Sequence, residues 1–190
     1  KSSEYGTCIN LLGLLYVRTG AYGKAEPLFF TAREIKRQTA GEEDADHITI
    51  TENLVWVYLK TGQYAKAEPL YIWLAGIKAK LLGENDPAYA AAINDLATAY
   101  LHMGEYKKAE PLFLRSLQIR RSALGETHAD YATSLDNLAS LYIYMNLYEK
   151  AEPLYLQSFH IRKAIIPETH ADYTNGLNNL ASLYLYTAQY

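Results

Sequence analysis

The stretch YKKAEPL, residues 106–112, decides the fold of this chain, because its pattern recurs along the sequence. The motif Tyr-x-Lys-Ala-Glu-Pro-Leu occurs four times, beginning at Tyr22, Tyr64, Tyr106 and Tyr148. Each copy starts 42 residues after the previous one, and Tyr190 stands where a fifth copy would begin. A fixed period of this size indicates that one supersecondary unit is stacked repeatedly. We therefore predict a solenoid of repeats rather than a globule.

Each repeat contains two segments with helical periodicity. In the first segment, apolar residues recur at three- and four-residue offsets, and a small residue such as Gly13 or Ala97 permits close approach of a second helix. The second segment begins near the lysine of the motif, which places its proline within the first turn, where a missing N–H costs little. Glycines such as Gly20 and Gly41 are suited to end the two helices. The predicted fold class is all-α, built from helix–turn–helix repeats.

The period also sets the boundaries of the repeats. We assign residues 1–190 to a single array, with full repeats at about 5–46, 47–88, 89–130 and 131–172 and a fifth first helix at 173–190. Terminal repeats of such arrays normally carry an atypical polar cap, and neither end of this sequence shows one. We interpret the chain as a piece of a longer protein.

Composition narrows the functional class. The formal net charge is −3, whereas binders of nucleic acids or of anionic membranes need a basic surplus, so we expect neither partner. No apolar run approaches the length of a membrane span, and no signal peptide is visible. The single cysteine, Cys8, excludes an internal disulfide and fits a reducing compartment, so we expect a cytoplasmic location.

The motif and its flanking sequences resemble tetratricopeptide repeats. The 42-residue period, with LNNLASLY at 177–184 and AEPLYLQSFHIRKA at 151–164, is similar to the kinesin-light-chain and nephrocystin-3-like subclass. The resemblance covers the whole chain. It implies a right-handed superhelix in which the first helices line a concave groove that binds a peptide or protein segment. In bacteria, it also implies arrays that accompany NTPase or caspase-like (CHAT) protease domains in larger signalling proteins.

If the first helices face inward, their positions not used for packing form a ladder of candidate peptide-binding residues. Asparagines of this ladder contact the ligand in kinesin-light-chain-like repeats, and an amide both donates and accepts, so it can pair with any peptide backbone. The alternative is that these side chains bond between adjacent repeats or keep the helix polar. The candidates are Asn10, Glu52, Asn53, Trp56, Lys60, Asn94, Thr98, His102, Asp136, Asn137, Ser140, Tyr144, Asn178, Asn179 and Ser182.

The ladder argues against a clamp for a C-terminal carboxylate, which would need Lys or Arg at the positions that here carry Asn, Glu or Asp. A ligand with a hydrophobic or acidic portion near Trp56, Arg18 and Lys60, and a polar portion near Tyr144 and Tyr186, fits better. The groove assignment also predicts that replacing Asn94 and Asn178 with alanine weakens binding and leaves the melting temperature nearly unchanged.

Other signals read as structural. His128 and His170 occupy equivalent loops, but no ligand spacing supports a metal there, so we predict helix capping and no metal or cofactor. Trp73 stands at a second-helix position that carries Thr31, Arg115 or Gln157 in other repeats. It could contact another domain on the outer face, or fold down over its neighbours.

Two functions are compatible with these features. No phosphate loop, dinucleotide fingerprint or zinc-protease motif is present, so we predict that the chain is not an enzyme. The first function is a scaffold that binds a peptide or protein in its groove. The alternative is a sensing or regulatory arm of a larger multidomain protein, in which case other domains of that protein are partners. RNA recognition would need a basic groove, and the acidic ladder positions speak against it.

Overall fold

In the computed structural model, residues 2–167 and 169–187 are described, and over this part of the chain the protein forms nine α-helices and no strands. Tyr190, where a fifth motif would begin, lies outside the described residues. The helices are α1 (Ser3–Arg18), α2 (Tyr22–Ala40), α3 (Ala45–Lys60), α4 (Tyr64–Leu82), α5 (Pro87–His102), α6 (Tyr106–Leu124), α7 (Ala129–Tyr144), α8 (Tyr148–Ile165) and α9 (Ala171–Thr187).

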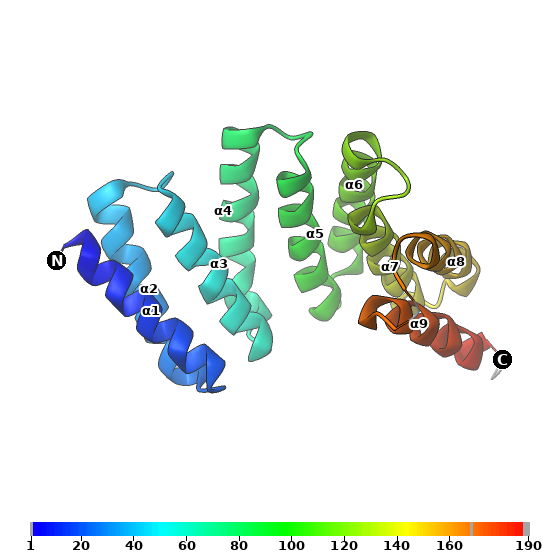
Figure 1. Ribbon diagram of the computed structural model, residues 1–190, viewed down its shortest axis with the longest axis horizontal. Helices are drawn as coiled ribbons and strands as arrows, with labels where there is room; N and C mark the ends of the chain where they lie inside the picture. The colour runs from blue at the N-terminus through cyan, green and yellow to red at the C-terminus, as the bar shows by residue number, and fades with distance from the viewer. Residues whose placement is uncertain (1, 168, 188–190) are drawn as a thin grey trace. The chain divides into compact units, whose positions relative to one another are not determined.

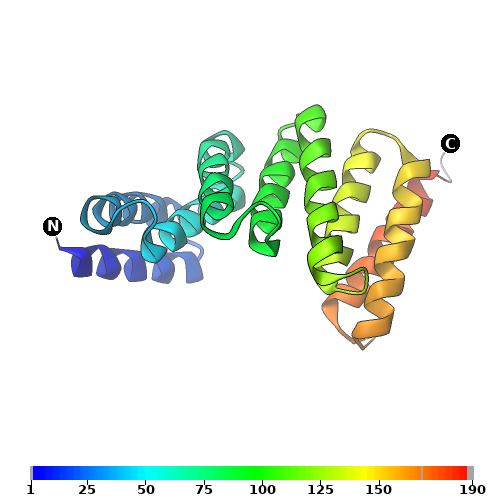
Figure 2. The ribbon, with the colours of Figure 1, turned by 90° about the horizontal axis from the view of Figure 1, so that it is seen from above.

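The chain divides into two units, 1–77 and 78–190, and the boundary falls within α4. In the first unit, α1 packs on α2 and α2 packs on α3. In the second, α5 to α9 pack each on the next in chain order, as the ribbons show (Figures 1 and 2). Each hairpin therefore contacts the hairpin that follows it within its unit, which is the nearest-neighbour packing of repeat proteins.

The interiors of the hairpins α1–α2 and α5–α6 depend on a small residue on the first helix and a buried ring on the second. Phe29 is fully buried, and a Cβ added to Gly13 would lie 2.7 Å from its Cε1 atom. In the second unit the equivalent residues Ala97 and Phe113 are both 0% exposed. The expected role of the small residue in close helix approach is confirmed.

The recurring heptapeptide is explained by three side chains. Its alanine, represented by Ala109, is 0% exposed in all four copies. Its lysine lies over a first-helix tyrosine of the same repeat: Lys108 Nζ is 5.1 Å from the centre of the Tyr100 ring. Its glutamate reaches the next repeat, where Glu110 accepts a 3.1 Å hydrogen bond from the Tyr142 hydroxyl. The motif thus joins the two helices of a repeat and adjacent repeats.

The helix ends follow the predicted signals. Gly20, which follows α1, has φ +73° and so adopts the left-handed conformation that most side chains disfavour. Asn146 adopts the same conformation after α7, with φ +59°. Asp86 caps α5, and its side chain accepts from the backbone N–H of Ala88 at 2.7 Å. His128 caps α7 by accepting from the N–H of Asp130 at 3.1 Å, so helix capping is confirmed for this histidine.

One local prediction is wrong. The second helices begin at the motif tyrosine, two residues before its lysine, so Pro27 lies in the second turn of α2 and not in the first. The ring nitrogen of Pro27 cannot donate to the carbonyl of Gly23, which leaves one helical hydrogen bond unmade. The helix nevertheless continues to Ala40, because its apolar face, including Phe29 and Ala32, is fully buried.

Candidate functional site

In the first unit, three candidate residues lie on one face of α3. Asn53, Trp56 and Lys60 are three and four residues apart, which aligns them along a helix. The Trp56 side chain is 39% exposed and meets the Tyr22 ring edge-on, with ring centres 5.6 Å apart. Lys60 Nζ lies 5.3 Å from the centre of the Trp56 ring. An exposed indole beside an ammonium group can bind a ligand that carries apolar and acidic groups.

The ladder asparagines bond to one another between repeats. Asn53 Nδ2 donates to Asn10 Oδ1 at 3.2 Å in the first unit, and Asn137 Nδ2 donates to Asn94 Oδ1 at 3.1 Å in the second. Hydrogen bonding between adjacent repeats is therefore confirmed for these two pairs. Contact of the same amides with a ligand stays a prediction.

Burial separates the two asparagines that were expected to behave alike. Asn94 is only 4% exposed, whereas Asn178 is exposed on α9. Removing the Asn94 amide would leave the Asn137 donor without its acceptor, which carries a stability cost. An alanine at Asn178 is the cleaner test of ligand contact.

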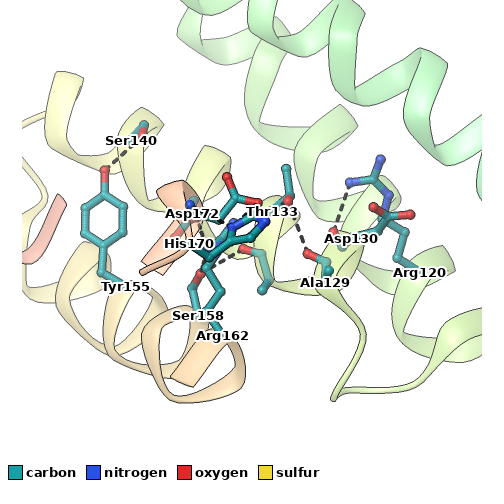
Figure 3. Close-up of polar contacts among 12 residues, drawn as sticks. Arg120, Ala129, Asp130, Thr133, Ser140, Tyr155, Ser158, Arg162, His170 and Asp172 are labelled. Carbon is teal, nitrogen blue, oxygen red and sulfur yellow. Dashed lines mark hydrogen bonds and ion pairs between the residues drawn. The ribbon is translucent and has the colours of Figure 1, made fainter. Parts of the chain in front are cut away.

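Asp136, another ladder residue, is held inside the second unit. Its carboxylate forms an ion pair with Arg162, and only 14% of its side chain is exposed. Arg162 also donates to Ser158 Oγ and, at 3.3 Å, to Thr133 Oγ1, in the cluster shown in Figure 3. Burial raises the pKa of Asp136 above its usual value, and the Ser158 and Arg162 hydrogen bonds oppose that rise. Its geometry is that of a packing contact between α7 and α8.

A cavity of about 370 Å³ lies among α7, α8 and α9. Four predicted residues line it, Ser140, Tyr144, Asn179 and Ser182, so the structure brings them together. A hydrogen bond joins the Tyr155 hydroxyl to Ser140 Oγ (Figure 3), and the two oxygens are 2.8 Å apart. Burial raises the pKa of Tyr155, which keeps the phenol protonated. Four of the first-helix candidates therefore share this cavity.

Sequence reasoning missed two other tyrosines of this cavity, Tyr148 and Tyr155, which are not among the candidates. A signal was present: Tyr155 carries a hydroxyl at a position where the first and third repeats have Phe29 and Phe113 and the second repeat has Tyr71. In two of the four repeats this position therefore places a hydrogen-bonding group within the buried core.

The other candidates are more dispersed. Thr98 is half-buried and donates to the backbone carbonyl of Asn94 at 3.0 Å. His102 on α5 and Arg18 at the end of α1 are exposed, and Glu52 is half-buried on α3. The side chain of Tyr186 lies outside the described residues.

Trp73 is half-buried on α4 and packs in the first unit. Its ring meets the His47 ring edge-on at 4.9 Å, and the Arg33 guanidinium lies 5.7 Å from its centre. His47 is fully buried, its Nδ1 is 3.1 Å from the Glu42 carbonyl, and its Nε2 has no partner among the described atoms. Contact of Trp73 with another domain stays a prediction, although much of its surface already serves this cluster.

Acid is expected to destabilise the first unit through His47. Burial and the Arg33 charge lower its pKa, against the opposing effects of Glu42 and Glu34, whereas an unfolded histidine titrates near about 6.5. The unfolded state therefore binds the proton better, so the stability from neutral His47 is present above about pH 6.5 and is lost as the pH falls below it.

The test is urea unfolding at pH 7.5 and pH 5, followed by tryptophan fluorescence, because both tryptophans lie in the first unit. His47→Tyr is the matched variant, since other repeats carry tyrosine at this position, as in Tyr89 and Tyr131. It should lose less stability between the two pH values than the natural chain. Equal losses would show that His47 does not carry the acid sensitivity.

Among the residues that the structure describes, no group of three or more His, Cys, Asp or Glu side chains could hold a metal ion. No described helix combines the length and the apolar character that crossing a bilayer requires.

The fold and the repeating contacts define a class of protein, the helical-repeat scaffold. The sequence profile of tetratricopeptide repeats matches residues 7–74, 77–121 and 88–164, and the chain belongs to this family of protein-interaction scaffolds. Its fold is the all-α solenoid of helix–turn–helix repeats, and kinesin-light-chain-like repeat proteins share this fold. No curated protein sequence matches the chain.

Solved structures share the fold at low sequence identity. Nearly identical TPR-like repeats of a kinesin light chain of Podosopora anserina are 23% identical, with a TM-score of 0.79 over 100% of this chain and 90% of that one. BtubC (BKLC) from P. vanneervenii is 24% identical, with a TM-score of 0.79 over 95% of this chain and 72% of that one. A Rap protein complexed with Competence and Sporulation Factor is 14% identical, with a TM-score of 0.74 over 96% of this chain and 49% of that one.

Proposed function

We propose that this chain binds an extended peptide or protein segment along its first helices and acts as a scaffold, not as a catalyst. The observation that carries the proposal is the set of first-helix side chains that packing leaves available. Trp56 is 39% exposed in the first unit, and Tyr144 is 55% exposed beside the cavity of the second. Large aromatic side chains of this kind are the usual anchors of protein interfaces.

The two units offer different chemistry to a ligand. In the first unit, Trp56 and Lys60 favour an apolar group next to a carboxylate. In the second unit, Tyr144, Asn178 and Ser182 supply neutral hydrogen-bonding groups. A segment bound to the first unit would present an apolar or acidic portion there, and a segment bound to the second unit would present a polar portion. A Rap protein of the same fold is complexed with Competence and Sporulation Factor, which supports occupation of this fold by a partner.

The experiment has two steps. Affinity capture with the whole chain as bait, followed by mass spectrometry, supplies a ligand, and overlapping peptides of that ligand supply a binding segment. Trp56→Ala is then expected to weaken binding of the segment at least about tenfold, because the indole is a hot-spot type of side chain. Asn178→Ala is expected to weaken it about threefold to tenfold with little change in melting temperature, since the residue is exposed.

Phe30→Ala is the matched control for Trp56→Ala. Phe30 is 54% exposed and lies on α2, a second helix, so it should not contact a ligand bound along the first helices. If Phe30→Ala weakens binding as much as Trp56→Ala, or if neither Trp56→Ala nor Asn178→Ala changes it, the first helices are not the binding surface.

The alternative is a sensing or regulatory arm of a larger multidomain protein, with other domains of that protein as partners. The domain content of the full-length protein distinguishes the two: an adjoining protease or NTPase domain supports the arm, and an entirely helical protein supports the scaffold. We place either one in the cytoplasm, where the exposed Cys8 would stay reduced.

A further inference from the structure

The cavity of the second unit combines a polar floor with apolar side chains, and the polar residues Asn146, Asn179 and Ser182 also line it. Tyr155, which is 6% exposed, and Ser140 form the floor, and their hydroxyl oxygens are 2.8 Å apart. Ile143 and Leu183 provide apolar wall, and Tyr144 is 55% exposed beside them. A volume of about 370 Å³ is within the usual range for a small-molecule site.

The hydroxyl pair specifies what kind of ligand atom the floor can satisfy. Each hydroxyl has one donor hydrogen and two acceptor lone pairs, and the bond between Tyr155 and Ser140 uses one hydrogen. One hydrogen and several lone pairs are then left for a ligand group that itself donates and accepts. An alcohol or a phenol meets this requirement, whereas a hydrocarbon would leave the remaining hydrogen and lone pairs of the two hydroxyls without a partner.

The lining also selects against charge. Among the described residues that line this cavity, none is Asp, Glu, Lys or Arg. A carboxylate or an ammonium group that entered would lose its hydration without gaining an opposite charge, which is strongly unfavourable. The aromatic side chains Tyr144 and Tyr148 at the same cavity favour a flat ring, which stacks on or meets their faces.

We infer that this cavity binds a neutral aromatic ring that bears a hydroxyl, with the ring between Ile143, Leu183 and Tyr144 and its hydroxyl on the Tyr155–Ser140 pair. The same chemistry has two sources, a tyrosine side chain of the bound segment and a free small phenol. The first source rests on the proposed function, and the second does not.

The test uses p-cresol, the side-chain analogue of tyrosine, with the full chain in solution. Toluene is the control without the hydroxyl, and p-toluate is the control with a charge. Binding is followed by the NMR signals of the methyl groups of Ile143 and Leu183 during titration. We expect p-cresol to shift these signals and to bind about tenfold tighter than toluene, the size of effect of one hydrogen bond. p-Toluate should not shift them.

Tyr155→Phe is the decisive variant. We expect this variant to fold, because Phe29 and Phe113 occupy the equivalent positions in other repeats and are fully buried there. It should reduce the affinity for p-cresol to that for toluene and leave toluene binding unchanged. Equal affinities for p-cresol and toluene in the natural chain, or p-cresol binding that Tyr155→Phe does not weaken, would overturn the inference.

A second arm identifies the source of the ring. If the captured segment loses affinity when its tyrosines are changed to phenylalanine, and Tyr155→Phe cancels that loss, the ring belongs to the peptide. If p-cresol binds as expected while segment binding is indifferent to Tyr155→Phe, the site takes a free phenol. Because p-cresol binding requires no peptide, failure of the proposed function and failure of this inference give different results.

Discussion

Asp136→Ala is expected to lower the free energy of unfolding by about 3–5 kcal/mol, because it leaves the buried Arg162 charge without its partner. The Arg162 side chain is only 9% exposed, and its remaining partners, Ser158 and Thr133, are neutral hydroxyls. The measurement is urea unfolding followed by circular dichroism, since both tryptophans lie outside the second unit.

Two further variants test the cause. Asparagine is the residue that other repeats carry at this position, as Asn94 and Asn178. Asp136→Asn keeps an acceptor for Arg162 and should therefore lose less stability than Asp136→Ala. Asp136→Leu combined with Arg162→Met removes both charges and should also be less harmful than the single alanine change. If Asp136→Ala instead changes stability by less than about 0.5 kcal/mol and abolishes binding of the captured segment, Asp136 acts on the ligand and not on the fold.

The period of the sequence was sufficient to predict the helices. Apolar spacing, the small residue at Gly13 and Ala97, and the glycines that follow helices α1 to α6 all follow from local chemistry, and the structure confirms them. The start of the second helices was placed two residues too late, near the motif lysine, which put Pro27 in the first turn. Burial of the helix face by its neighbours outweighed one missing hydrogen bond, and sequence alone does not weigh these two effects.

The candidate site was less predictable, because equivalent positions differ in their neighbours. Asn10, Asn94, Asp136 and Asn178 share one place in the repeat, yet Asn94 is buried, Asp136 is paired with Arg162 and Asn178 is exposed. These differences depend on the side chain that the adjacent helix supplies, 26 residues further on for Arg162. The period identifies which residues are equivalent but not which side chains they contact. The prediction therefore treated the first-helix positions as more alike than they are.

Phe29→Ala is expected to destabilise the first unit by about 3–5 kcal/mol, the usual cost of removing a fully buried ring. Gly13→Ala alone should cost about 1–3 kcal/mol, because its Cβ would lie 2.7 Å from Phe29 Cε1 and a ring cannot bend away. When the ring is absent, the same methyl group should fill part of the cavity. The double variant is therefore expected to lose less stability than the two single variants lose together. The measurement is urea unfolding followed by tryptophan fluorescence.

The pair Ala97 and Phe113 explains why this coupling is informative. There an alanine lies opposite a phenylalanine and both are fully buried, so the helices of that hairpin accommodate the methyl group that Gly13 lacks. If α1 and α2 can adopt that spacing, Gly13→Ala will be nearly neutral, and coupling with Phe29→Ala will vanish. If Gly13→Ala lowers stability only while Phe29 is present, the helices α1 and α2 are held closer together than the helices that carry Ala97 and Phe113. Phe30→Ala, on the exposed face of α2, is the control and should cost less than about 1 kcal/mol.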